Sequence, residues 1–170
     1  MSPPLKIMSP HSPFSFVIFV LTIGAAMILR VMSLWPIWDM FNPDWIALAL
    51  IYWSIALPER IGVFTAFCVG LLTDVLTGCL LGQYALIYVV TSYFSIKQHR
   101  RLRQFPLIQQ CLFVLLCFLL GRSLIFAIEL MQASANRLPS SFWYPALSGA
   151  LAWPLVFYVL RAIRVFARIS

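Results

Sequence analysis

Three charged side chains fall inside long apolar stretches, where a charge is costly to bury and commonly serves a function. They are Asp74, Arg122 and Glu129. Two chemistries suit such a set: an ion pair that fixes how two helices pack, or a path for protons or ions through a membrane. A proton path would need a chain of several acidic residues, and the sequence shows none beyond these three charges. The residues therefore favour the packing role.

Asp74 lies on a stripe of small residues, a pattern that lets two helices approach closely. The stripe takes every fourth position and comprises Gly62, Ala66, Gly70, Asp74, Gly78 and Gly82. A carboxylate on this face meets protein and needs a partner or a proton. Arg122 matches it best in depth, so we predict an Asp74–Arg122 pair. Glu129 lies two turns beyond Arg122 on the same face, where it either shares the guanidinium or lies at the outer rim.

The sequence contains no recognisable catalytic or metal-binding set. An intramembrane serine protease needs a buried histidine base, but His11 and His99 both lie outside the apolar stretches. The HExxH, Walker A and GxGxxG motifs are absent. The four cysteines lie in apolar runs without CxxC spacing, as expected of thiols that only pack. We therefore expect no enzymatic activity, no cofactor and no metal.

The elements that must position these charges are membrane helices. The chain is 62% hydrophobic and only 10% charged, whereas soluble chains are about 25% charged. We predict an all-helical transmembrane bundle at residues 14–170, preceded by a cytoplasmic tail at 1–13, with an uncleaved first helix. The six predicted spans cover about 14–34, 45–57, 62–81, 83–96, 106–131 and 143–166. Pro154 should kink the last span.

The net charge of +7 suits either a nucleic-acid surface or an orientation signal at a membrane. With six spans and both termini in the cytoplasm, most basic residues fall on the cytoplasmic side, which favours the orientation signal. This predicted basic face comprises Lys97, Arg100, Arg101, Arg103, Arg161, Arg164 and Arg168. The first four of these also suit contact with anionic lipid headgroups. A nucleic-acid partner is left without support.

Three stretches are distinctive together. Residues 42–60 begin Asn-Pro-Asp-Trp and end Leu-Pro-Glu-Arg. Residues 70–82 contain Gly-Leu-Leu-Thr-Asp-Val-Leu-Thr-Gly and then Leu-Gly, and residues 148–161 contain Ser-Gly, Trp-Pro and a final arginine. Over about residues 42–168 the chain resembles the MreD family, the rod shape-determining membrane proteins of bacteria.

The resemblance implies a non-enzymatic, multi-pass scaffold subunit of the inner membrane, in the elongation machinery that makes lateral peptidoglycan. It implies an MreC-like single-span partner and, through it, a RodA-type glycosyltransferase, its penicillin-binding transpeptidase and MreB filaments. The family is also similar in fold to the substrate-binding subunits of vitamin transporters, which keeps a transport subunit as the alternative. A ligand site of that kind needs several convergent polar groups. Few exist outside Asp74, Arg122 and Glu129, which favours the scaffold.

Overall fold

The computed structural model of the chain describes residues 13–32, 41–131 and 140–166. Within these ranges it is all-helical, as predicted. In chain order its elements are α1 (Pro13–Val31), α3 (Trp45–Ala56), α4 (Val63–Thr77), α5 (Gln83–Leu102), α6 (Leu107–Met131), the 3-10 helix η2 (Ser140–Trp143) and α7 (Tyr144–Phe166). Residues 1–12 of the predicted tail, and Arg168 of the predicted basic face, lie outside the described residues.

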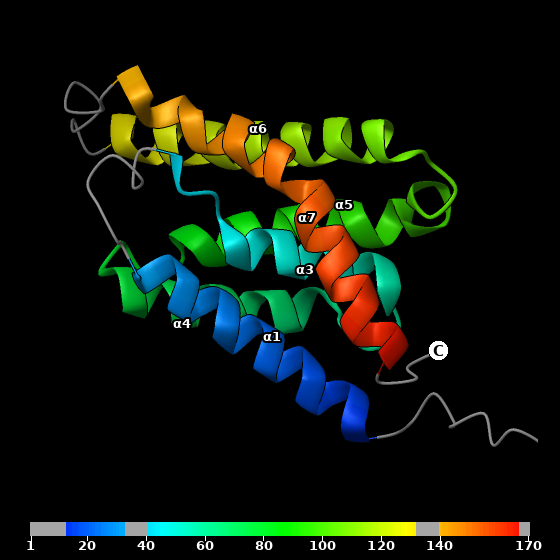
Figure 1. Cartoon of the computed structure of the whole chain (residues 1–170). Helices are drawn as coiled ribbons and strands as arrows, with labels where there is room; N and C mark the ends of the chain where they lie inside the picture. Colours follow the sequence, from blue (N-terminus) through cyan, green and yellow to red (C-terminus); the bar gives the residue numbers. More distant parts are fainter. Residues whose placement is uncertain (1–12, 33–40, 132–139, 167–170) are drawn as a thin grey trace, which may run out of the picture.

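Successive α-helices run in opposite directions, so the two ends of the bundle collect different parts of the sequence (Figure 1). One end holds the last turn of α1 and the first turns of α3 and α5, with Arg30, Asp44 and Gly82. We call it the outer end, after the predicted topology. The opposite end holds the last turns of α3, α5 and α7, with Arg103 and Arg161 at or near it. We call it the inner end.

Helix α3 is the centre of the bundle. It is apolar on all sides, and every residue from Ile46 to Ser54 is buried. A helix without a polar face must be covered all round, and α1, α5 and α7 pack against it. Trp53 is fully buried there, and its indole N–H donates to the Thr22 hydroxyl of α1 at 3.0 Å. The core of the molecule is therefore built around a helix of only 12 residues.

Helix length separates the elements into two classes. By length and composition, α6 and α7 are the two described helices able to cross a membrane, with 25 and 23 residues. At 1.5 Å per residue, α3 and α4 reach only about 18 and 22 Å, against a hydrocarbon thickness of about 30 Å. Helix α5 has 20 residues, but its last turn is basic. The short helices are thus the ones enclosed by, or paired with, a longer neighbour.

Helices α4 and α5 end at clearly different residues from the spans predicted for them, and both differences have a physical cause. Helix α4 ends at Thr77 and not near residue 81, because Gly78 adopts the left-handed conformation with φ of 63°. Helix α5 continues past Ile96 through the basic segment to Leu102, since lysine, glutamine and arginine are good helix formers. The bounds of α6 and α7 match the predicted spans to within a residue. Helix α7 contains Pro154, and Figure 1 shows its course bending along its length.

Candidate functional site

Asp74 lies in the last turn of α4 and is only 1% exposed. Its carboxylate accepts three backbone N–H groups at the start of α5, from Gly82 at 2.8 Å, Tyr84 at 2.7 Å and Ala85 at 3.3 Å. The first N–H groups of a helix have no partner within the helix, and the helix dipole favours an anion beside them. The carboxylate therefore joins the end of α4 to the beginning of α5.

This arrangement depends on the turn between the two helices. Gly78 ends α4 with a φ of 63°, and Gly82 precedes α5 with a φ of 104°. Residues with a Cβ rarely adopt these angles. With two such residues the chain reverses direction over a few positions and brings the start of α5 back to Asp74. Gly78 was predicted to allow close helix packing, but no neighbouring atom lies within 4 Å of where its Cβ would be. Its role in the structure is to form the turn.

Gly70 marks the closest approach of α4 and α5. A Cβ at this position would lie 2.3 Å from the Cα and 2.7 Å from the N of Ala85. Because both atoms belong to the backbone, neither can move aside without separating the helices. Gly149 of α7 is similarly crowded, by the ring of Phe118 of α6 at 2.3 Å. The small residues at 70 and 149 thus permit two close helix contacts.

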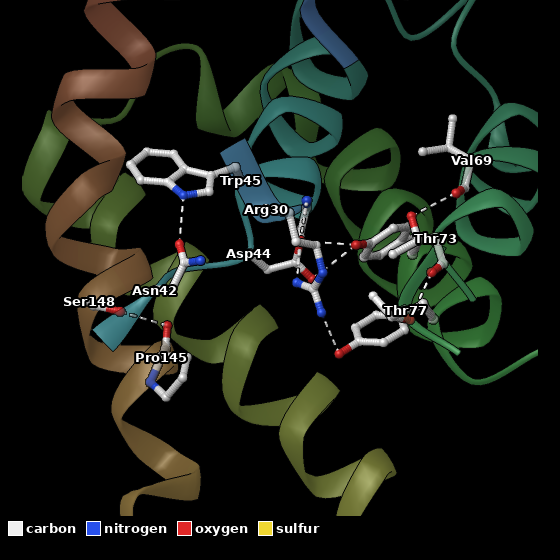
Figure 2. A network of polar contacts seen from close by, with 12 residues as sticks. Arg30, Asn42, Asp44, Trp45, Val69, Thr73, Thr77, Pro145 and Ser148 are labelled. Carbon is white, nitrogen blue, oxygen red and sulfur yellow. Dashed lines mark hydrogen bonds and ion pairs between the residues drawn. The ribbon is translucent and has the colours of Figure 1, made fainter. Parts of the chain in front are cut away.

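A second charge cluster lies at the outer end and joins α1, α3 and α5. The Arg30 guanidinium pairs with the Asp44 carboxylate at 3.4 Å, and it donates to the Tyr84 hydroxyl at 2.6 Å. The Tyr88 hydroxyl, which is buried, donates to the same carboxylate at 2.9 and 3.0 Å. Figure 2 shows Arg30 and Asp44 pointing toward one another. Four side chains from three elements of the bundle thereby form one network.

Asp44 also organises the local chain. It is the N-cap of α3, and its carboxylate accepts the backbone N–H of Ala47 at 3.1 Å, as is usual for an aspartate at this position. Next to it, the indole of Trp45 donates to the side-chain carbonyl of Asn42 at 2.8 Å (Figure 2). The stretch from Asn42 to Trp45 thus starts the central helix and supplies the acid of the network.

Arg122 does not pair with Asp74, so the predicted pair is corrected. Its guanidinium lies over the Phe142 ring, 5.0 Å from the centroid, in a cation–π contact. It also lines a cavity of about 30 Å³ together with Arg30, Asp44 and Tyr84. Of the described acids, Asp44 is the one that lines this cavity with Arg122. The prediction failed because α4 ends early, which leaves Asp74 beside the start of α5.

Glu129 lies seven residues after Arg122 in α6 and is half-buried. Within the described part of the chain it forms no ion pair, so the structure does not show it sharing the guanidinium of Arg122. Its place near the outer end of α6 is compatible with the rim alternative. The same ranges contain no cluster of three or more His, Cys, Asp or Glu residues that could hold a metal ion.

The predicted basic face lies at the ends of two helices. Lys97, Arg100 and Arg101 belong to the last turns of α5, and the ammonium of Lys97 lies 5.8 Å from the Tyr93 ring centroid. Arg103 follows α5 directly and donates to the carbonyls of Ile55 at 2.9 Å and Ala56 at 2.7 Å, at the end of α3. Arginine is well suited to binding such terminal carbonyls. Arg161 and Arg164 lie near the end of α7.

The sequence reasoning missed Arg30, Tyr84 and Tyr88 as network residues, and it did not identify Asp44 as their acid. One signal was available, since Arg30 and Asp44 are opposite charges assigned to the same side of the membrane and separated by one short connection. The tyrosines carry no such signal, because an aromatic residue in an apolar helix is typical of ordinary packing. Chemically, both charge clusters are fully occupied with holding helix ends together.

Comparisons with known proteins agree on one family. The family model described as rod shape-determining protein MreD matches residues 11–163. The rod shape-determining protein MreD of Haemophilus influenzae is 35% identical over 135 residues, which cover 76% of this chain and 80% of that protein. No solved structure matches the chain. Since the family model covers nearly the whole chain, the chain belongs to the MreD family of rod shape-determining membrane proteins.

Proposed function

We propose that this chain is a non-enzymatic scaffold subunit of the bacterial inner membrane, with six spans and both termini in the cytoplasm. Membership of the MreD family supports a role in cell shape. Within that role, the chain would bind an MreC-like single-span protein and, through it, associate with a RodA-type glycosyltransferase, its penicillin-binding transpeptidase and, indirectly, MreB filaments. The match over residues 11–163 is the observation that carries the proposal.

The exposed sides of α6 and α7 support the proposal that the bundle is embedded in a membrane. Helix α6 exposes Ile108, Leu112, Leu116 and Leu120, at every fourth position, and α7 exposes Leu147, Leu151, Leu155 and Val159 in the same way. Large apolar stripes of this kind are stable only against lipid or another apolar surface. These stripes are also surfaces on which helices of a partner protein can pack.

The interior supports a structural role. The buried charges are used in hydrogen bonds and ion pairs that fasten α4 to α5 and α1 to α3 and α5. A transport subunit for a vitamin would need convergent polar groups around an enclosed volume. The outer network encloses only about 30 Å³, which is room for about one water molecule. The outer charges therefore offer no vitamin site, and the family match favours the shape role.

The topology is tested by reporter fusions. A fusion after Ser170 and one in the connection after Arg103 should both report the cytoplasm, because the basic residues gather at that end. A fusion at Asn136 should report the periplasm. Any one reporter on the opposite side would contradict the six-span arrangement.

The scaffold role is tested by depletion and co-purification. In a rod-shaped host that depends on this protein, depletion should produce rounded cells. An MreC-like protein should co-purify from detergent extracts of the same membranes, whereas an unrelated single-span protein at equal abundance should not. Cells that remain rod-shaped after clean deletion would contradict the proposed role.

A further inference from the structure

We propose that the inner end of the bundle binds the phosphate group of an anionic phospholipid, in a cavity between α3, α5, α6 and α7. The cavity has a volume of about 370 Å³, within the range of about 300–1,000 Å³ that is usual for small-molecule sites. It is distinct from the two charge clusters described above, which lie at the outer end. Lipid binding at this cavity requires only that the bundle is embedded in a membrane. It is therefore independent of the proposed scaffold role.

Three arginines supply the charge of this cavity. Arg103 comes from the end of α5, and Arg161 and Arg164 come from α7, one turn apart. None of the described residues that line the cavity is acidic. Guanidinium groups bind phosphate oxygens well, because their planar fork of N–H donors matches two oxygens at once. The charge of the cavity therefore selects an anion.

The arginines differ in how far they are already occupied. The two hydrogen bonds from Arg103 to the carbonyls of Ile55 and Ala56 fix its guanidinium at the cavity wall. In the described part of the chain, neither Arg161 nor Arg164 forms an ion pair. Arg164 is within hydrogen-bonding reach of the Tyr52 hydroxyl, and Arg161 lies near that hydroxyl. Two neighbouring cations without an acid repel each other, and a bound phosphate would remove that cost.

The remaining walls favour a lipid over a free phosphate ion. Trp153 is fully buried, and its indole N–H donates to the side-chain carbonyl of Gln110 at 3.2 Å, so its polar atom is already used. Phe157 adds a second apolar surface, and Val165 at the rim is 68% exposed. A ligand with a phosphate beside an apolar chain matches both parts of this wall.

The position along the bundle agrees with that occupant. The arginines lie at the end that the charge pattern predicts to be cytoplasmic, where headgroups of acidic phospholipids give the membrane surface a negative potential. The exposed Leu151 and Leu155 lie about two to three turns before Arg161 on α7. An acyl chain packed against this part of α7 would place its headgroup at the level of the cavity.

The test is native mass spectrometry of the full chain purified in detergent, titrated with phosphatidylglycerol and, separately, with phosphatidylcholine. The wild-type chain should retain phosphatidylglycerol preferentially. The Arg161→Gln/Arg164→Gln variant should retain at least about tenfold less phosphatidylglycerol, because each lost contact is a charge-assisted hydrogen bond. The control is Arg100→Gln/Arg101→Gln, which removes the same charge at the same end outside the cavity. Arg100 and Arg101 suit only diffuse contact with headgroups, so this variant should lose clearly less phosphatidylglycerol than the cavity variant.

Several outcomes would overturn the proposal. An equal loss in the two double variants would mean diffuse attraction to the basic surface, and equal retention of the two lipids would exclude an anion-selective site. Inorganic pyrophosphate should displace phosphatidylglycerol from the wild-type chain. If the chain binds pyrophosphate but retains no phosphatidylglycerol, the ligand is a free phosphate compound and not a lipid, and the proposal fails. If the double variant does not fold by circular dichroism, Arg161→Gln alone is used, since this side chain is exposed. Undiminished lipid retention in that folded variant would also overturn the site.

Discussion

At the outer end of the bundle, Arg30 is bound by Asp44 and by the hydroxyl of Tyr84, whereas at the inner end Arg161 and Arg164 face a cavity whose described lining contains no acid. Arg30 thus holds helices together at the outer end, whereas at the inner end Arg103 is bound to the end of α3 and Arg161 remains available. Because charge counts treat all arginines alike, only their surroundings distinguish the two uses. If this difference is real, substitutions at the outer end should cost more stability than those at the inner end, and most of all at Asp74, which joins α4 to α5.

The largest effect is expected for Asp74→Ala. The substitution leaves the N–H groups of Gly82, Tyr84 and Ala85 without their buried acceptor, and each hydrogen bond to a charged group contributes about 1.5–3 kcal/mol. We expect a loss of roughly 3 kcal/mol or more in the free energy of unfolding, measured by thermal or denaturant unfolding in detergent. Asp74→Asn is the matched control and should lose less, since its carbonyl oxygen still accepts. Equal losses would contradict the hydrogen-bonding role.

An intermediate effect is expected when the outer network is tested by a double-mutant cycle. Arg30→Gln and Asp44→Asn should each destabilise the chain, and the coupling energy between them should be about 1–2 kcal/mol. The same cycle with Asp74→Asn and Arg122→Gln is the control, and its coupling energy should be close to zero because those residues do not meet. A larger coupling energy for Asp74 with Arg122 than for Arg30 with Asp44 would contradict the structure.

The smallest effect on stability is expected at the inner end. Arg161→Gln should change the free energy of unfolding in lipid-free detergent by no more than about 0.5 kcal/mol, as for other exposed positions. Thermal unfolding of this variant beside Arg30→Gln checks the comparison directly. If Arg161→Gln were the more damaging of the two, the inner arginines would be structural and the contrast between the ends would fail.

Much of the fold was accessible from the sequence because apolar runs and their polar interruptions mark membrane helices directly. The bounds of α6 and α7 follow from long uninterrupted runs, and the start of α3 follows from the proline, aspartate and tryptophan at 43–45. The predicted end of α4 is too late, because apolar residues lie on both sides of the turn: Val75 and Leu76 come before Gly78, and Leu80 and Leu81 come after it. Gly78 decides the boundary through its backbone conformation, which hydropathy does not report.

The candidate sites were harder to predict, because partners were matched by depth alone. Asp74 and Arg122 are both buried within predicted spans, and counting residues places them at similar depths. However, a carboxylate can also be satisfied by the unpaired N–H groups of a neighbouring helix start, and no side chain signals that option. Asp44, the acid of the outer network, precedes α3 in a loop-like stretch, outside the apolar runs that mark a charge as buried.

The hydrogen bonds of Asp74 join residues only 8 to 11 positions apart in the chain. The Tyr88–Asp44 and Arg103–Ile55 contacts, by contrast, span 44 and 48 positions. Contacts that are close in sequence form fastest, and chains begin to fold from the N-terminal side during synthesis. The pair of α4 and α5 can therefore close before the contacts that join it to α3. Two helices, one of them shorter than the hydrocarbon layer is thick, can then pack in the bilayer as one unit whose exposed helix start is already covered.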